Sequence, residues 1–372
     1  MRVMIFTCGT GGGHNSAAYA LSEEMFRRGH EVQLMNPYEL KSAKLAGVID
    51  KSYIKLVQTA PILFGAVYRI GKRYRKSPRK SPVSRFNSKI APFLKEYLDV
   101  HNFDVILMTH FLPGGILANV KEQGGQVPPS ILIATDYTCV PLTEEAAADA
   151  YIIPTKELTD EFAAIGIPKE KIYPLGIPVS KVFSDKKGKA AARKELGLPE
   201  GKRCILIAGG SMGAGKIMDI LNVLTQQYCS QNTQYIVISG RNPSLYEQLQ
   251  EQYGDSMIIL QHTQKMATYL SACDVFISKP GGLSTTEAAV SEIPLIHITP
   301  IPGCETANAE YFSRLGMSYY VQNFEEELAS VLSHLEIEDT TENMRCAQRE
   351  GINKKATSDI CDLAEAFLQK KN

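Results

Sequence analysis

The feature that most constrains the fold is a series of short apolar runs that recurs along most of the chain. The runs are rich in Val and Ile, and most are followed by Gly or by a polar turn. Because most are continuous rather than alternating, they indicate parallel strands buried on both faces, and the helix-period segments between them complete βαβ units. The sequence therefore predicts an α/β protein. The runs are 3–7, 31–35, 105–109, 131–135, 151–153, 172–175, 204–208, 235–239, 257–260, 275–278 and 295–298.

The chain is long enough for two such sheets, since it has 372 residues and domains usually contain roughly 100–200. The apolar pattern lapses between 182 and 202, where a Lys-rich stretch follows Pro178. We therefore expect a first domain at 1–181 and a second at 182–342, with a helical segment at 343–372 that either closes the second domain or packs back on the first. The predicted fold class is α/β, with two doubly wound, Rossmann-like domains facing a cleft.

Composition excludes several other classes. With 28 Gly, 19 Pro and 22% charged residues, the chain is neither disordered nor fibrous. Its longest fully apolar stretch, 61–68, is far shorter than the roughly 20 residues of a membrane-spanning helix. The N-terminus reads as a first strand rather than a secretion signal, and the eight cysteines form no C-x-x-C pair. We expect reduced thiols, a cytoplasmic protein and no zinc site.

The net charge of zero conceals a strongly basic segment. Residues 51–95 contain 12 Lys and Arg but no Asp or Glu, which leaves 28 of the 40 basic side chains and all 40 acidic ones in the rest of the chain. Aromatic residues are interleaved with the charges, as on a surface that meets anionic lipid. A solvated basic loop and a nucleic-acid surface are the alternatives. The residues expected to contact membrane or acceptor are Tyr68, Arg69, Arg73, Tyr74 and Arg75.

Three strand-to-helix junctions carry glycines, at the strand ends where open α/β sheets bind ligands. The first, 7–18, contains Gly13 and His14, and its backbone N–H groups are able to approach an anion closely. Tight turns also need glycine for steric reasons alone. The second, 207–216, nearly matches a nucleotide triphosphate loop, but Ile217 stands where that loop needs a hydroxyl for Mg²⁺.

The third junction, 278–288, predicts a diphosphate site. Gly281 and Gly282 open a helix whose first turn supplies free N–H groups and hydroxyls, and Lys279 adds positive charge. Glu287 lies one turn further on, where a carboxylate is placed to accept hydrogen bonds from ribose hydroxyls. The alternative is that Ser284 and Glu287 form a capping box. The three junctions together favour a nucleotide on the second domain with its reacting end toward His14.

The ordered set of motifs resembles the GT-B glycosyltransferases that include diacylglycerol glucosyltransferases, monogalactosyldiacylglycerol synthases and, more distantly, the family 28-like transferase that adds N-acetylglucosamine to lipid I. The matching segments are 11–18, 135–141, 176–178, 209–214, 278–288 and 302–309. The resemblance implies an inverting transferase that uses a UDP-sugar as donor substrate, without cofactor or catalytic metal. The absence of an Asp-x-Asp pattern from the sequence agrees with that expectation.

The resemblance also assigns donor-binding residues. It implies that Glu287 binds the ribose, that the turn 263–266 faces the uracil, and that Glu305 and Asn308 address the sugar hydroxyls. Cys304 stands where relatives commonly have a Gln that contacts the sugar, so glucose, galactose and N-acetylglucosamine all stay open. The full donor set is Gly13, Gly210, Ser211, Thr263, Met266, Lys279, Gly281, Gly282, Leu283, Ser284, Glu287, Glu305 and Asn308.

Inversion needs a base that takes the proton of the acceptor hydroxyl. His14 is the first candidate, because an imidazole with its usual pKa is largely unprotonated at neutral pH; it could instead steady the diphosphate. Asp136 is the second candidate, with orientation of His14 or a simple helix cap as its alternatives. His110 follows another strand and lines the acceptor side, unless it is an ordinary strand-end residue.

We therefore predict a hexosyltransferase that moves a sugar from a UDP-sugar to a membrane lipid, first of all diacylglycerol, and gives a β-glycosyl glycolipid. It would act peripherally on the inner face of the cell membrane, with no nucleic-acid partner. Two alternatives stay open: a UDP-N-acetylglucosamine transferase acting on a prenyl-diphosphate-linked sugar, and a non-catalytic nucleotide-sugar-binding membrane protein. An epimerase of the related two-domain type is disfavoured, because it needs no lipid-facing surface.

Overall fold

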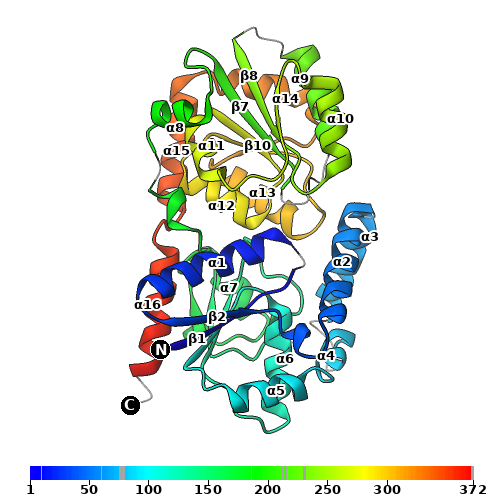
Figure 1. The fold of residues 1–372 in the computed structure, drawn as a ribbon, viewed down its shortest axis with the longest axis vertical. Helices are drawn as coiled ribbons and strands as arrows, with labels where there is room; N and C mark the ends of the chain where they lie inside the picture. The colour runs from blue at the N-terminus through cyan, green and yellow to red at the C-terminus, as the bar shows by residue number, and fades with distance from the viewer. Residues whose placement is uncertain are drawn as a thin grey trace. The chain divides into compact units, whose positions relative to one another are not determined.

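The computed structural model describes residues 1–9, 11–59, 61–74, 80–185, 187–210, 213, 216–228 and 232–369, with the backbone alone at some positions of 53–74 and at 369. These residues form two compact units. The first contains Met1–Ser180, Pro302–Cys304 and the chain from Asn353 onward, and the second contains Lys181–Ile301 and Glu305–Ile352. The division falls one residue before the boundary expected at 181, and it places 343–352 with the second unit. Each unit is built on one parallel sheet (Figure 1).

The sheet of the first unit has the order β2-β1-β3-β4-β5-β6. Its strands are β1 (Arg2–Phe6), β2 (Glu31–Met35), β3 (Val105–Met108), β4 (Ser130–Ile133), β5 (Ala150–Ile152) and β6 (Ile172–Tyr173). The chain leaves β1 toward β2 on one side and then returns to β3 on the other, so the strand order reverses between β1 and β3. Phe6 is paired with Met108, which brings the turns after β1 and β3 together at the carboxyl edge. Ligands of doubly wound sheets bind at such a switch point.

Helices cover both faces of this sheet, because successive strand residues point to opposite sides. Val3 and Ile5 of β1 pack with α1 and α16, whereas Met4 and Phe6 face the cluster beneath α5 and α6. The helices of this unit are given next in chain order. The elements are α1 (Gly12–Arg27), η1 (Pro37–Leu40), α2 (Ala43–Thr59), α3 (Pro61–Tyr74), α4 (Pro82–Asn87), α5 (Ala91–Val100), α6 (Phe111–Glu122), η2 (Thr143–Glu145), η3 (Lys156–Leu158), α7 (Thr159–Ala163), η4 (Lys169–Lys171) and α16 (Ala356–Gln369).

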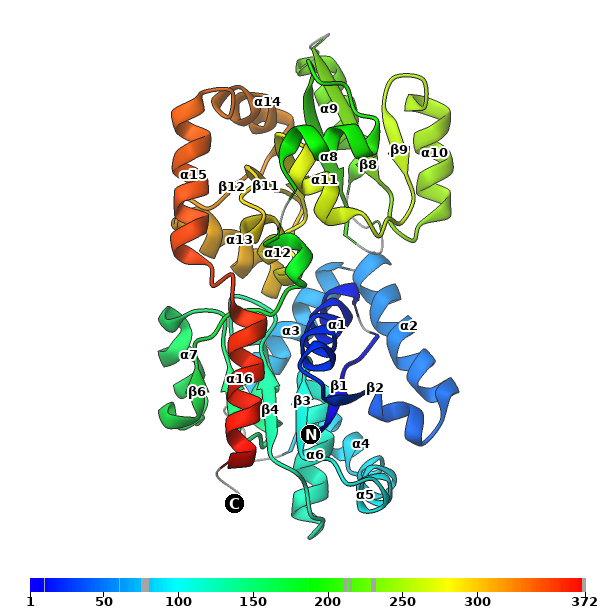
Figure 2. The ribbon, with the colours of Figure 1, turned by 60° about the vertical axis from the view of Figure 1, so that its left-hand side comes forward.

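The last helix, α16, belongs to the first unit, so the C-terminal segment is divided: 343–352 stays with the second unit and α16 packs on the first. Figure 2 shows α16 on the same side of the sheet as α1. Ile360 and Ala364 are fully buried against the strands. Arg28 of α1 fixes the helix further, because its guanidinium donates to Asp362 at 2.5 Å and to Ser358 Oγ at 2.8 Å.

The second unit has the sheet order β12-β11-β10-β7-β8-β9, again parallel throughout. β12 is a half-buried pair of tyrosines with no apolar run, and the sequence analysis did not predict it. The elements are η5 (Lys181–Phe183), α8 (Lys189–Leu196), β7 (Arg203–Ala208), α9 (Ile217–Gln227), β8 (Thr233–Ile238), α10 (Pro243–Tyr253), β9 (Ile258–Leu260), α11 (Met266–Ala272), β10 (Val275–Ser278), α12 (Gly282–Val290), β11 (Leu295–His297), α13 (Cys304–Arg314), β12 (Tyr319–Tyr320), α14 (Phe324–His334) and α15 (Glu338–Gly351).

The switch point of the second sheet lies between β7 and β10, because β8 continues from one side of β7 and β10 from the other. Ala208 is paired with Ser278, so two of the three Gly-rich junctions leave the sheet side by side. Within the described part of the chain, no helix is both long enough and apolar enough to span a membrane.

Candidate active site

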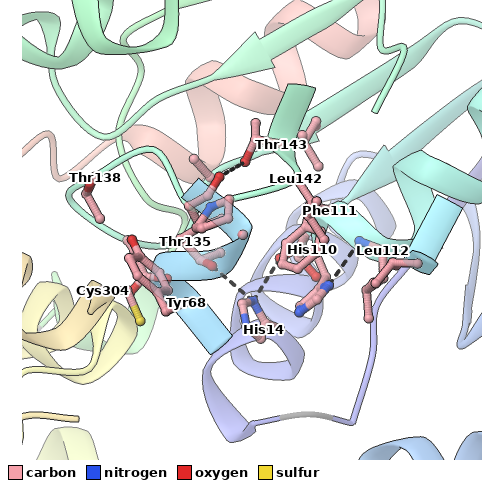
Figure 3. A pocket seen from close by; sticks show the side chains of 18 of the residues that line it. His14, Tyr68, His110, Phe111, Leu112, Thr135, Thr138, Leu142, Thr143 and Cys304 are labelled. Carbon is pink, nitrogen blue, oxygen red and sulfur yellow. Dashed lines mark hydrogen bonds between the residues drawn. The ribbon is translucent and has the colours of Figure 1, made fainter. Parts of the chain in front are cut away.

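His14 lies on the first turn of α1, at the switch point of the first sheet. Its Nδ1 is 2.9 Å from the carbonyl oxygen of Thr109 and 2.9 Å from Oγ1 of Thr135 (Figure 3). Because a carbonyl oxygen only accepts, Nδ1 carries the ring proton and Nε2 keeps its lone pair. Burial lowers the pKa of His14 to about 4, against an opposing effect of the Thr109 carbonyl. The ring is therefore neutral at physiological pH and able to accept a proton at Nε2.

His110 meets His14 edge to face, with ring centroids 4.4 Å apart and an interplanar angle of 78°. It caps α6, because its Nδ1 accepts from the N–H of Leu112 at 3.1 Å. Burial and the neighbouring His14 lower the pKa of His110 well below its usual value, so the neutral ring must carry its proton on Nε2. The two histidines thus present one accepting and one donating nitrogen, a combination that a single hydroxyl group satisfies.

Both histidines line a cavity of about 400 Å³ in the first unit. Asp136, partly buried after β4, lines the same cavity, so all three residues proposed for the acceptor chemistry come together. Most of the lining is apolar, and Asp136 is the one carboxylate among the described lining residues. They are His14, Tyr68, Ile70, Gly71, Ser81, Pro82, Val83, Thr109, His110, Phe111, Leu112, Leu132, Ile133, Ala134, Thr135, Asp136, Thr138, Val140, Pro141, Leu142, Thr143 and Cys304.

Part of the basic segment 51–95 lines this cavity, and part of it is exposed. Tyr68 lines it from α3, and a Cβ on Gly303 would lie 2.9 Å from the Tyr68 ring. Arg69 and Arg73, on the same helix, are exposed instead. The side chain of Tyr74 and the whole of Arg75 lie outside the described residues.

Most of the apolar wall is not predicted from the sequence: 81–83 and 142–143 carry no signal, and 138–141 is noted only as part of the motif 135–141. The residues that build this wall come from short loops, a helix of one and a half turns and a strand end, and none of these has a periodic pattern. One signal does exist in the structure: Leu142 has a φ of 71°, a left-handed conformation that a leucine rarely adopts.

The Gly-rich junctions of the second unit form the candidate donor site. Gly210 has a φ of 74°, and a Cβ there would lie 3.7 Å from Cε of Lys279. Gly281 is the N-cap of α12 and supplies no side-chain cap. The first N–H groups of α12, including those of Gly282 and Leu283, are therefore available to an anion. Ser211 lies outside the described residues.

The capping box considered for this helix is not present. The N-cap is Gly281 rather than Ser284, and Ser284 donates its hydroxyl proton to the Gly281 carbonyl oxygen at 3.2 Å. Glu287 is left partly buried, without a hydrogen bond or ion pair among the described residues. Burial raises the pKa of Glu287 to about 8. A desolvated carboxyl without a partner at a sheet edge is typical of a ligand-binding position.

Three of the expected donor-binding side chains, Lys279, Glu305 and Asn308, make hydrogen bonds within the turns after β10 and β11. Lys279 Nζ lies 3.0 Å from Oε1 of Glu305, whose Oε2 accepts from the Ile301 N–H at 2.7 Å. Asn308 donates to the carbonyl oxygen of Pro280 at 2.9 Å. All three side chains are buried. They hold the turns after β10 and β11 in place, and their direct contact with diphosphate or sugar stays a prediction.

The expected uracil turn lies after β9, the edge strand of the second sheet. Thr263 Oγ1 accepts from the N–H of Lys265 at 3.0 Å, and Met266 begins α11. Both side chains are partly exposed. Gly13, in contrast, belongs to the first turn of α1, beside His14. Among the described residues, no group of three or more His, Cys, Asp or Glu side chains is placed to hold a metal ion.

Comparison with known proteins yields two family matches. The monogalactosyldiacylglycerol (MGDG) synthase family matches residues 14–179, and the glycosyltransferase family 28 C-terminal domain matches residues 204–362. The chain is also 27% identical, over 349 residues, to the processive diacylglycerol β-glucosyltransferase of Bacillus subtilis. That alignment covers 92% of this chain and 89% of the relative.

Two solved structures share the fold of the whole chain. Acinetobacter baumannii MurG aligns with a TM-score of 0.64 and 18% identity, covering 98% of this chain and 99% of its own. The glycotransferase of kitacinnamycin aligns with a TM-score of 0.67 and 15% identity, covering 99% of each chain. At such identities the likeness establishes the arrangement of strands and helices and nothing about substrates.

Proposed function

Because the chain belongs to the GT-B glycosyltransferases of the MGDG synthase and family 28 group, we propose that it transfers a hexose from a UDP-sugar to diacylglycerol. The family is inverting, so the product is a β-glycosyl glycolipid. Glucose is the sugar to test first, since a relative that matches nine-tenths of the chain is named a diacylglycerol β-glucosyltransferase. The assignment of a lipid acceptor rests on the apolar cavity, which is lined by two neutral histidines.

In the proposed reaction, the lipid hydroxyl donates its proton to Nε2 of His14 while its oxygen attacks the anomeric carbon of the sugar. The bond between that carbon and the UDP oxygen breaks, and its electron pair leaves with UDP. N–H groups at the start of α12 bind the diphosphate and stabilise its growing charge. His110 donates from Nε2 to the attacking hydroxyl and so orients its lone pair toward the sugar.

The membrane is the second partner in the proposal. Arg69 and Arg73 are exposed on α3, and Ile70 between them is 57% exposed. At about 1 kcal/mol for each basic residue near an anionic bilayer, half of the 12 in residues 51–95 would be enough to hold the protein at the surface. We place the enzyme peripherally on the inner face of the cell membrane, where anionic lipid and UDP-sugars are both accessible.

The proposal is tested with liposomes that contain either 1,2-diacylglycerol or a prenyl-diphosphate-linked sugar, and each is offered UDP-glucose, UDP-galactose or UDP-N-acetylglucosamine in separate reactions. Mass analysis of the extracted lipid should show a hexosyl diacylglycerol with one of the first two donors. EDTA should leave the rate unchanged, because no step is assigned to a metal. Release of UDP without a lipid product, or a product on prenyl-diphosphate-linked sugar alone, would reject the diacylglycerol assignment.

A further inference from the structure

The cavity of the first unit is larger and more apolar than a glycerol hydroxyl requires. Its volume is about 400 Å³, and a water-sized group such as a methylene takes about 30 Å³, so it holds about 13 such groups. Its lining is mostly apolar, and the two histidines mark one part of it. There, His14 and His110 lie beside Thr109, whose hydroxyl is buried and has no hydrogen-bond partner among the described residues.

We propose that this cavity receives one acyl chain of the lipid acceptor, with the glycerol hydroxyl held between His14 and His110. The inference rests on the proposed function and names the substrate part that the cavity binds. In Figure 3, His110 lies beside His14, and Leu142 and Thr143 lie away from this pair. The chain runs from the histidines toward Leu142 and Thr143.

An apolar wall makes the transfer of a chain from the bilayer feasible. A chain that leaves the bilayer for an apolar cavity exchanges one apolar environment for another, so the transfer is close to neutral. A chain that leaves water for the cavity gains about 0.8 kcal/mol for each methylene, which multiplies binding about fourfold. With acceptors dissolved as monomers, the dependence of binding on chain length therefore measures contact with the cavity. With acceptors in a bilayer, it does not.

The conformation of Leu142 is a second observation that points to a ligand. Its φ of 71° is one that glycine adopts without strain and leucine does not. The Leu142 side chain is partly exposed and lines the cavity, so the strain is not explained by a place in the core. It is explained if an apolar side chain is needed at this point of the wall, since strained residues cluster at ligand-binding positions.

The test uses 1-acyl-2-acetylglycerols whose single long chain is varied from four to ten carbons, below the concentration at which they aggregate. With the wild-type enzyme, kcat/KM should rise by up to about fourfold for each added methylene. Val83→Trp adds bulk to the wall on α4 and should level this rise at a shorter chain. Val100→Trp is the matched control, because Val100 is 71% exposed at the end of α5, and it should follow the wild type.

Leu142→Gly removes the apolar side chain and also relieves the strain. It should lower the ratio of kcat/KM for ten carbons to that for four, without lowering the melting temperature. If the wild type transfers sugar to these acceptors but kcat/KM is the same at four and ten carbons, or if Val83→Trp follows Val100→Trp while it still binds UDP, the acyl-chain assignment is wrong and the proposed function stands. If no acylglycerol of any length is glycosylated, the proposed function itself fails.

Discussion

At the scale of single residues, the tautomer of His14 explains how a buried ring serves as the base. The Thr109 carbonyl fixes the proton on Nδ1, so Nε2 needs no deprotonation before it acts. His14→Ala should lower kcat by about 10²–10⁴-fold, the usual contribution of a general base. UDP binding, measured by calorimetry, should be unchanged. A variant with normal kcat would remove His14 from the mechanism.

The pKa of His14 gives a second test. Burial lowers this pKa to about 4, so the neutral, active form persists well below the usual histidine pKa of about 6.5. With the UDP-sugar saturating, so that the titration of Glu287 does not enter, the acid limb of kcat against pH should therefore lie below pH 6, and kcat should fall only as the pH drops toward that lowered pKa. Measurement at saturating lipid surface, with UDP release as the readout, locates the limb. An acid limb centred near 6.5 contradicts the buried, neutral ring.

Glu287 predicts a pH dependence of donor binding that has the same direction as that of His14 but lies at a higher pH, because its pKa is shifted upward. Burial raises its pKa to about 8, so at pH 7 roughly nine-tenths of the free protein carries a protonated carboxyl. Ribose hydroxyls donate best to the carboxylate, so UDP affinity should rise with pH as this group loses its proton. From pH 7 to 8.5 the gain should be up to about eightfold. Glu287→Gln, which does not titrate, should show a weaker and flatter affinity across the same range.

At the scale of elements, helix α16 is part of the core of the first unit. Ile360 is fully buried in the cluster that contains Val3, Ile5 and Leu107. Ile360→Ala should therefore lower the free energy of unfolding of this unit by about 2–5 kcal/mol, the usual loss for such a truncation. Urea denaturation followed by circular dichroism measures the loss. Val100→Ala is the control in the same unit, because Val100 is 71% exposed, and an equal loss in both variants would contradict the packing.

The strands show what the sequence was able to predict at this scale. Wherever a buried parallel strand contributes a continuous apolar run, as at 105–109 or 275–278, the run marks the strand to within a residue or two. β12 is missed because two half-buried tyrosines form no run. The helical segment near the C-terminus is found, but its break between α15 and α16 at 352–355 is not, since the spacing of apolar residues continues across it.

For the site residues too, the positions set by strand order were predictable from the sequence, and the contacts set by loop conformation were not. His14, His110 and Asp136 each follow a strand, and strands that are neighbours in a parallel sheet bring such residues to one edge, so topology alone places them together. Lys279 and Glu305 were each expected to face the donor, yet they form a buried ion pair with each other. The sequence contains no signal for that pairing, because it depends on how two loops fold after β10 and β11. The wall at 138–143 depends on loop conformation in the same way.

At the scale of the whole molecule, the net charge of zero divides into a basic segment at 51–95 and an acidic remainder. If the basic segment contacts the bilayer, neutralising Arg69 and Arg73 together should weaken binding to anionic vesicles by up to about 30-fold, at about 1 kcal/mol for each residue. Lys156→Ala with Lys169→Ala removes the same charge from exposed positions of the same unit, and this pair should change binding much less. Vesicle sedimentation at low and high salt measures both pairs.

The salt dependence separates a charge effect from an apolar one. Screening reaches about 8 Å at physiological ionic strength and about 3 Å at 1 M, so electrostatic binding should fall steeply between these conditions and be weak on vesicles of neutral lipid alone. Ile70, exposed between the two arginines, contributes an apolar contact that salt does not weaken. If the arginine pair and the lysine pair weaken binding equally, binding depends on how many positive charges are removed and not on where they lie. In that case, the segment 51–95 is not the membrane surface.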